Sequence, residues 1–133
     1  MTYILDTNIC IYIIKRKPES VVDRLQKMQS DQLAVSTITV AELEYGVRKS
    51  AQPEKNQLAL QNFLMPLSIL NFDFAATLEY GIIRSELERK GTPIGPLDLL
   101  IAAHAKSLGH TLVTNNEKEF SRIDGLHIEN WVK

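Results

Sequence analysis

Short apolar runs alternate with longer amphipathic stretches along all 133 residues, and this alternation constrains the fold more than any other feature. Such a pattern is typical of an α/β protein, in which helical crossovers join parallel strands. The predicted strands span residues 3–5, 33–36, 67–72, 111–114 and 126–132. We therefore expect a mostly parallel five-stranded sheet with helices on both faces, which is a three-layer helix–sheet–helix sandwich.

Cap and stop signals place helices between these strands. Asp6, Thr7 and Asn8 all favour helix N-termini, so the β-branched run after them is interpreted as a helix. Gly91 and Gly109 are expected to end two later helices. The predicted helices span residues 9–14, 18–28, 40–49, 53–64, 74–90, 97–108 and 117–123. The helix at 74–90 is amphipathic, and four residues are expected near one of its faces: Leu78, Ile82, Ser85 and Leu87.

Length and composition limit what the chain can be. A chain of this length suits one domain, so residues 1–133 are expected to form a single unit. Fifteen Lys and Arg against sixteen Asp and Glu give a net charge of -1, which excludes a nucleic-acid binder that works by bulk basicity. The longest apolar run, at 9–14, is far shorter than the roughly 20 residues of a membrane-spanning helix. Cys10 has no partner for an intramolecular disulfide, so we expect a reduced, cytoplasmic protein.

Four acidic residues lie at predicted strand–helix junctions: Asp6, Glu42, Asp98 and Glu119. Helix capping explains each of them singly. Asp6 is an N-cap candidate, and Glu42 fits a capping box with Thr39. Asp98 falls in a first helical turn, where the helix dipole favours an acid, and Glu119 lies three residues after Asn116 in another cap-like pattern. In a parallel sheet, however, the helix N-termini open on the carboxyl edge, so we expect the four carboxylates to converge there.

Converging carboxylates repel one another unless a cation neutralises them. Hard oxygen ligands favour Mg²⁺, with Mn²⁺ possible, over zinc, and the cysteine and histidines show no zinc spacing. We predict that Asp6, Glu42 and Asp98 bind the ion and that Glu119 completes the acidic rim. An ion held in this way suits phosphoryl chemistry. Supporting hydrogen bonds are expected from Thr7, Asn8, Thr114 and Asn115, for which ordinary capping and turn chemistry is an equal explanation.

Other motifs narrow the function further. Six basic residues are candidates for contacts with RNA phosphates, with solvated surface as the alternative: Lys15, Arg16, Lys17, Arg84, Arg89 and Lys90. The chain has no Gly-rich phosphate loop and no dinucleotide-binding turn, which argues against a nucleotide cofactor. Its three histidines have no partnered Ser or Cys, so a nucleophilic triad is not expected.

Four segments carry a family resemblance: Leu5-Asp6-Thr7-Asn8, Ala41-Glu42-Leu43, residues 93–98 (Pro-Ile-Gly-Pro-Leu-Asp) and residues 113–120 (Val-Thr-Asn-Asn-Glu-Lys-Glu-Phe). They resemble the motifs of the PIN-domain ribonucleases, and more narrowly those of the VapC toxins of bacterial type II toxin–antitoxin pairs. The resemblance runs from Asp6 to about Trp131. It implies a Mg²⁺- or Mn²⁺-dependent endoribonuclease with a parallel five-stranded sheet, whose acidic residues correspond to the four acids named above.

The resemblance also implies a homodimer, and a VapB antitoxin whose C-terminal segment blocks the site, often with an arginine. The forms at residues 6–11 and 93–96 look closest to the subgroup that cuts initiator tRNA in its anticodon loop. Many relatives have an aspartate where this chain has Asn116. Because an asparagine can ligate through its carbonyl oxygen but brings no charge, this departure favours one bound ion over two.

Two functions of other kinds stay open. The first is a non-catalytic binding module that uses the acidic pocket as a socket for a partner's arginine. The second is a phosphatase or receiver-type domain with Asp6 as phosphate acceptor. The chain lacks the second downstream Asp of haloacid-type phosphatases, and no lysine ends the fourth predicted strand as receivers require.

Overall fold

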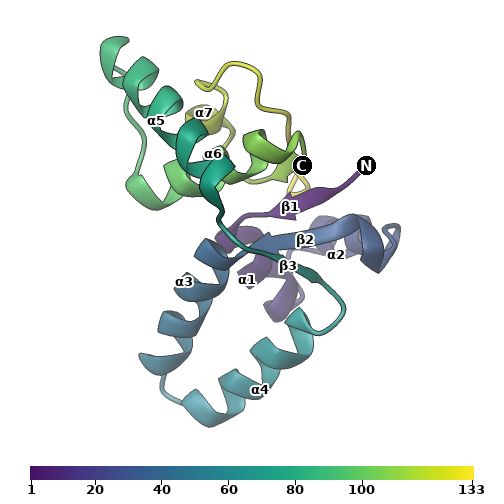
Figure 1. Ribbon diagram of the computed structural model, residues 1–133. Helices are drawn as coiled ribbons and strands as arrows, with labels where there is room; N and C mark the ends of the chain where they lie inside the picture. The colour runs from purple at the N-terminus through teal and green to yellow at the C-terminus, as the bar shows by residue number, and fades with distance from the viewer.

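A five-stranded sheet separates two groups of helices in the computed structural model, which covers residues 1–133 (Figure 1). The strands are β1 (Tyr3–Leu5), β2 (Leu33–Ser36), β3 (Ser68–Leu70), β4 (Thr111–Val113) and β5 (Ile128–Glu129). Their order in the sheet is β3-β2-β1-β4-β5, and every neighbouring pair is parallel. The predicted α/β class and parallel five-stranded sheet are therefore confirmed.

Helices cover both faces of this sheet. They are α1 (Thr7–Lys15), α2 (Glu19–Gln26), α3 (Thr37–Arg48), α4 (Pro53–Leu64), α5 (Phe74–Arg89), α6 (Pro96–Leu108) and α7 (Glu117–Phe120), with a 3-10 turn at Ser30–Gln32. In Figure 1, α1 to α4 lie on one side of the sheet and α5 to α7 on the other. A membrane-spanning helix is not found, because none combines the length and the apolarity that a bilayer requires.

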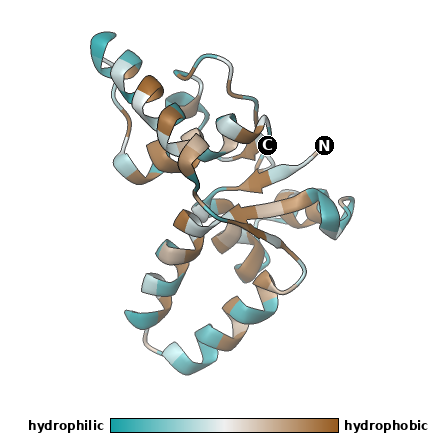
Figure 2. Cartoon of the chain, in the orientation of Figure 1, coloured by the Kyte–Doolittle hydropathy of each residue, from teal (hydrophilic) through white to brown (hydrophobic).

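Alternate side chains of the strands supply two separate cores, as the period of two in a strand requires. Ile4 of β1 packs with residues of α5, α6 and α7, whereas its neighbour Leu5 packs with residues of α1, α3 and α4. Figure 2 shows the strands and the helix turns facing them in brown, and the outer ends of α3 and α4 in teal. The three-layer arrangement thus follows from the strand sequences themselves.

The edge strand β5 is shorter than predicted. It pairs with β4 only through Ile128 and Glu129, although the sequence pattern indicated a strand over 126–132. Immediately after it, the Asn130 side chain accepts a hydrogen bond from the Val132 N–H at 2.9 Å, which turns the chain. Trp131 then enters the core and is fully buried. The apolar residues of this segment therefore serve packing rather than strand pairing.

The structure corrects the predicted face of α5. Ala76, Ile83 and Leu87 are buried against the rest of the molecule, and α5 packs on α6. Leu78 and Ile82 are 57% and 52% exposed. Of the residues predicted near one face only Leu87 is buried, because the contact with α6 buries the side of Ala76, Ile83 and Leu87.

The start of α3 is also corrected. The N-cap is Ser36, whose Oγ accepts a hydrogen bond from the Ile38 N–H at 3.1 Å, so the helix begins three residues earlier than predicted. Glu42 therefore lies in the second turn, and the predicted capping box with Thr39 is wrong. A buried histidine of α6, His104, holds this arrangement, since its Nδ1 lies 2.8 Å from Ser36 Oγ. The Ser36 hydroxyl can donate to Nδ1 while its oxygen accepts from the helix.

We expect Ser36→Ala to lower the free energy of unfolding by about 2–3 kcal/mol, because it removes the N-cap and leaves His104 Nδ1 without its partner. Urea unfolding followed by circular dichroism measures this loss. Ser85→Ala, at an exposed position of α5, is the matched control and should change stability by less than about 0.5 kcal/mol. An equally small loss for Ser36→Ala would contradict the role assigned to its hydroxyl.

Candidate active site

The candidate site lies where the order of the strands changes direction. From β1 the chain passes to β2 and β3 on one side, and then to β4 and β5 on the other. In open α/β sheets, the crevice beyond the carboxyl ends at such a switch point is where ligands bind. Asp6 follows β1 and Thr114 follows β4, and the Asp6 N–H donates to the Val113 carbonyl at 3.0 Å. The topology thus places the two side chains at one crevice.

Asp6 is the most buried of the four acids, with only 5% of its surface exposed. Its Oδ1 accepts a hydrogen bond from the Ile9 N–H at 2.9 Å, so it caps α1 as predicted. Burial raises the pKa of Asp6 to about 6, hydrogen bonds from Thr114 and Ile9 oppose that rise, and the charges of Asp98 and Glu42 add to it. Asp6 is therefore a cap and a poorly solvated acid at the same time.

Asp98 occupies the first turn of α6, two residues after Pro96. Burial raises its pKa, and the negative charges of Glu119 and Glu42 raise it further. A hydrogen bond from the Asn116 side chain lowers it. The charges of Asp98 and Glu42 act on Asp6, and those of Glu119 and Glu42 act on Asp98. A common metal site of Asp6, Glu42, Asp98 and Glu119 stays a prediction.

Hydroxyl and amide side chains hold three of these acids. Thr7 Oγ1 donates to Glu42 Oε1 at 2.7 Å, which joins the first turn of α1 to the second turn of α3. The Thr114 side chain hydrogen-bonds Asp6, and its own Oγ1 accepts from the Asn116 N–H at 2.9 Å. These contacts fix the carboxylates relative to one another.

The other two predicted supporting residues lie differently. Asn115 is exposed, and its Oδ1 accepts a hydrogen bond from the Asn130 side chain at 3.1 Å. That contact joins the ends of β4 and β5. Asn8 is exposed in the first turn of α1. The structure therefore brings Thr7, Thr114 and Asn116 to the acids but neither Asn8 nor Asn115.

No basic side chain neutralises this cluster. The salt bridges in the protein join Arg24 to Glu129, Arg84 to Glu88, Lys90 to Asp124 and Lys133 to Glu117. The carboxylates also stay apart, since no three His, Cys, Asp or Glu side chains are arranged to hold a metal ion together. Hard oxygen donors with uncompensated charge and raised pKa values fit a divalent cation, which would draw them together or bind some of them through water.

The basic residues predicted to contact phosphate are all exposed: Lys15, Arg16, Lys17, Arg84, Arg89 and Lys90. Two of them, Arg84 and Lys90, form exposed ion pairs with Glu88 and Asp124 at 3.0 and 3.3 Å. Exposed pairs of this kind contribute little and are easily exchanged for another anion. The structure thus leaves all six accessible to a polyanion.

The sequence analysis did not single out Arg122. Arg122 lies just beyond α7, and its Nη1 donates to the Pro93 carbonyl at 3.0 Å. It forms no ion pair with any carboxylate. A single arginine in a polar segment gives no signal in the sequence, because its position depends on how two distant loops meet.

A groove of about 390 Å³ opens beside the acids, between α1, α3 and α4. Thr7 and Glu42 form its acidic end, and Lys15 lies on its wall. Its apolar walls are made by Ile11, Ile14, Leu43, Val47 and Leu60. The sequence could not predict this groove, because its lining comes from three helices that meet only in the folded chain.

Comparison with known proteins gives the family. The PIN domain model matches residues 3–126. The chain is 50% identical to ribonuclease VapC2 of Rickettsia felis, with all of both chains aligned. It is 46% identical to the tRNA(fMet)-specific endonuclease VapC of Salmonella typhimurium, over 98% of each chain. A crystal structure of VapBC2 from Rickettsia felis bound to a promoter DNA fragment contains a chain with 48% identity and a TM-score of 0.93, which covers 98% of this chain and 99% of that one.

These matches cover essentially the full length of both proteins, and they agree with the parallel sheet and its acidic carboxyl edge. The chain belongs to the PIN-domain family, in its branch of VapC ribonucleases. The resemblance drawn from the four sequence segments is therefore confirmed.

We expect Asp6→Asn to stabilise the metal-free protein at neutral pH, since asparagine retains a cap acceptor for the Ile9 N–H but carries no charge. Because the pKa of Asp6 is raised to about 6 in the folded protein, wild-type stability should fall as the pH rises from about 4 to about 6. The fall should amount to at most about 3 kcal/mol. Chemical unfolding in EDTA between pH 4 and pH 8 measures it. If the stability of the wild-type protein and of Asp6→Asn depended on pH in the same way, the pKa of Asp6 would not be raised by burial.

Proposed function

We propose that the protein is a cytoplasmic toxin endoribonuclease that uses a bound divalent ion to hydrolyse RNA phosphodiester bonds. The observation that carries the proposal is a set of carboxylates without a basic partner at the switch point, of which Asp6 is the most buried. Membership of the VapC branch supports RNA as the substrate. The name of the Salmonella typhimurium relative supports initiator tRNA, and we expect cleavage in its anticodon loop.

The three acids proposed to hold Mg²⁺ or Mn²⁺ are Asp6, Glu42 and Asp98, because they interact with one another and have no basic partner. When bound, such an ion activates water and neutralises charge on the phosphate. Thr7 orients the Glu42 carboxylate through its hydroxyl, and Asn116 orients Asp98. Since Asn116 adds no charge, one ion is favoured over two.

The other residues of the site act on water and RNA. Glu119 stands on the rim beside Asp98 and is proposed to orient the attacking water or accept its proton. The buried Thr114 hydroxyl keeps Asp6 in place. Selection of the RNA would rest on exposed loop bases and on phosphate contacts from the six exposed basic residues.

Purified protein should cleave a tRNA pool with Mg²⁺ or Mn²⁺ and stop in EDTA. Asp98→Asn should lower the cleavage rate by more than about 100-fold. Loss of a residue that only hydrogen-bonds to a metal ligand costs about 10- to 100-fold, and loss of a ligand itself should cost more. Asp31→Asn, an exposed acid outside the site, is the matched control and should cut at the wild-type rate. Gel analysis of end-labelled tRNA gives the rates. Wild-type cleavage by Asp98→Asn, or cleavage in EDTA, would overturn the assignment.

We also propose that a VapB-type antitoxin neutralises the protein by occupying the groove between α1, α3 and α4. Its apolar walls suit the apolar face of a short helix, and its acidic end at Thr7 and Glu42 suits an arginine. The similar chain from Rickettsia felis belongs to a structure described as a VapBC2 complex, which supports a partner of this kind.

Gly46→Gln should weaken antitoxin binding about tenfold or more, because a side chain there would enter the groove. A Cβ at Gly46 meets nothing within 4 Å, so the substitution should not disturb the fold. Gly81→Gln is the matched control, since Gly81 is also helical and open but lies on α5. Calorimetric titration with the antitoxin measures both affinities. Equal affinities for the two variants would place the antitoxin elsewhere.

A homodimer is proposed as well. Phe74, Leu78 and Ile82 follow one another at four-residue spacing on α5 and are 77%, 57% and 52% exposed. An apolar row of this kind on a helix surface is typical of a contact with another protein surface. A second copy of the chain is the partner expected for it.

A second candidate function is a non-catalytic module that uses the acids as a socket for a partner's arginine. The groove that ends at Glu42 favours it, because a partner seated there would reach the unpaired carboxylates. This function requires tight partner binding without metal and no RNA turnover. Metal titration of the cleavage reaction therefore separates it from the endoribonuclease.

A further inference from the structure

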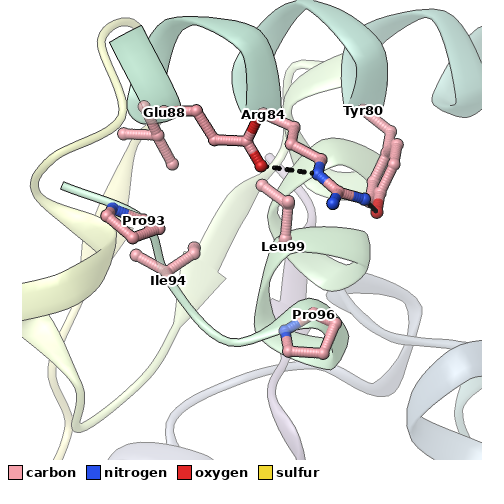
Figure 3. Close-up of a pocket in the computed structure, with 8 residues that line it drawn as sticks. Tyr80, Arg84, Glu88, Pro93, Ile94, Pro96 and Leu99 are labelled. Atoms are coloured by element: carbon pink, nitrogen blue, oxygen red, sulfur yellow. Dashed lines mark hydrogen bonds and ion pairs between the residues drawn. The ribbon is translucent and has the colours of Figure 1, made fainter. Parts of the chain in front are cut away.

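A second cavity, of about 200 Å³, lies on the other side of the sheet between α5 and the loop that precedes α6 (Figure 3). Its floor is apolar and is formed by Leu87, Ile94 and Leu99. Tyr80 and Arg84 of α5 form part of its rim. The antitoxin groove does not include this cavity, and of its lining the proposed function uses only Arg84, as one of six candidates for phosphate contacts.

The rim of the cavity carries two flat groups that contact each other, Tyr80 and Arg84. Arg84 Nη1 donates to the Tyr80 hydroxyl at 2.9 Å, and Arg84 Nε donates to Glu88 Oε2 at 3.0 Å. The guanidinium carbon lies 6.0 Å from the centroid of the Tyr80 ring. In Figure 3 these side chains reach from α5 along the mouth of the cavity. A planar ligand would therefore meet two π-faced groups that lie beside each other.

The cavity is joined to the acidic cluster by the chain itself. Pro96 and Leu99 line the cavity and belong to the first turn of α6, which also carries Asp98. Arg122 binds the carbonyl of Pro93, another lining residue, from a segment just beyond α7 and Glu119. The first turn of α6 is thus common to the cavity and to Asp98.

We propose that the cavity holds one unstacked base of the RNA, next to the phosphodiester that is cut. The inference rests on the proposed ribonuclease function. A base has two apolar faces and a polar edge, which match the apolar floor and the rim of Tyr80, Arg84 and Glu88. Arg122, which forms no ion pair, donates to the carbonyl of the lining residue Pro93, so a phosphate that follows the base would find an unpaired cation there. The volume suits a single ring system and is too small for a helix of a protein partner.

The test measures RNA binding in the Asp98→Asn protein, so that affinity is read without turnover. The probes are fluorescent single-stranded RNAs that span the cleavage position once it has been mapped. Each RNA of the series lacks one base, at a different position. Anisotropy should show that one abasic position near the cut weakens binding by about 5- to 100-fold, the range expected for loss of a stacked base. When Tyr80→Leu or Arg84→Leu is combined with Asp98→Asn, the protein should bind the intact RNA more weakly. It should then bind the RNA that lacks the critical base no more weakly than the intact RNA. Tyr80→Phe keeps the aromatic ring, so this variant should still bind the abasic RNA more weakly than the intact RNA.

Tyr45→Leu is the matched control, because Tyr45 also stacks with a cation, Lys49, on an exposed helix surface but lies outside the cavity. Arg84 is more than half exposed, so Arg84→Leu tests the cavity even if the tyrosine variant unfolds. An abasic profile unchanged by both leucine variants would overturn the proposal. The proposal would also be overturned if the leucine variants changed the oligomeric state or the antitoxin affinity but left the binding of the abasic RNAs unchanged. The cavity would then be a contact with another protein. Loss of cleavage by the wild-type protein is a separate result that would overturn only the ribonuclease function.

Discussion

The arrangement of the site depends on the buried carboxyl group of Asp6. Asp6 directly follows the central strand β1 and lies at the switch point of the sheet. Its side chain caps α1 by accepting a hydrogen bond from the Ile9 N–H. A cap stabilises the fold, whereas a buried charge without a partner destabilises it. Asparagine would cap the helix equally well without the charge. The presence of an aspartate is therefore not explained by capping alone and favours a role in binding a cation.

Most of the fold could be predicted from the sequence, and the topology is the reason the four acids are expected at one edge of the sheet. Once five strands are parallel, the residues after β1 and β4 and the N-termini of α3 and α6 must share one edge of the sheet. The exact neighbours of each acid could not be predicted in the same way. Thr7 reaches Glu42 across 35 positions, and that contact depends on how α1 and α3 cross.

The errors in the prediction have one physical cause, which is that local patterns offer several equivalent choices. Residues 36–39 contain three cap formers, and the buried His104, 68 positions away, selects Ser36 among them. In α5 the periodicity allows two apolar faces, and packing on α6 buries Ile83 and Leu87 rather than Ile82. Tertiary contacts decide between alternatives that the sequence leaves nearly equal.

The unpaired carboxylates also connect the proposed RNA cleavage with its proposed inhibition by an antitoxin. A divalent ion and a partner's guanidinium would neutralise the same carboxylates, so the two would compete for one site. The groove adds apolar area that only a protein partner can use, and it ends where Thr7 holds Glu42. Such a partner gains affinity from the walls while it displaces the ion from the acids. Inhibition of this kind requires no second conformation of the protein, because the occupant of the acidic edge alone decides whether RNA and water can meet there.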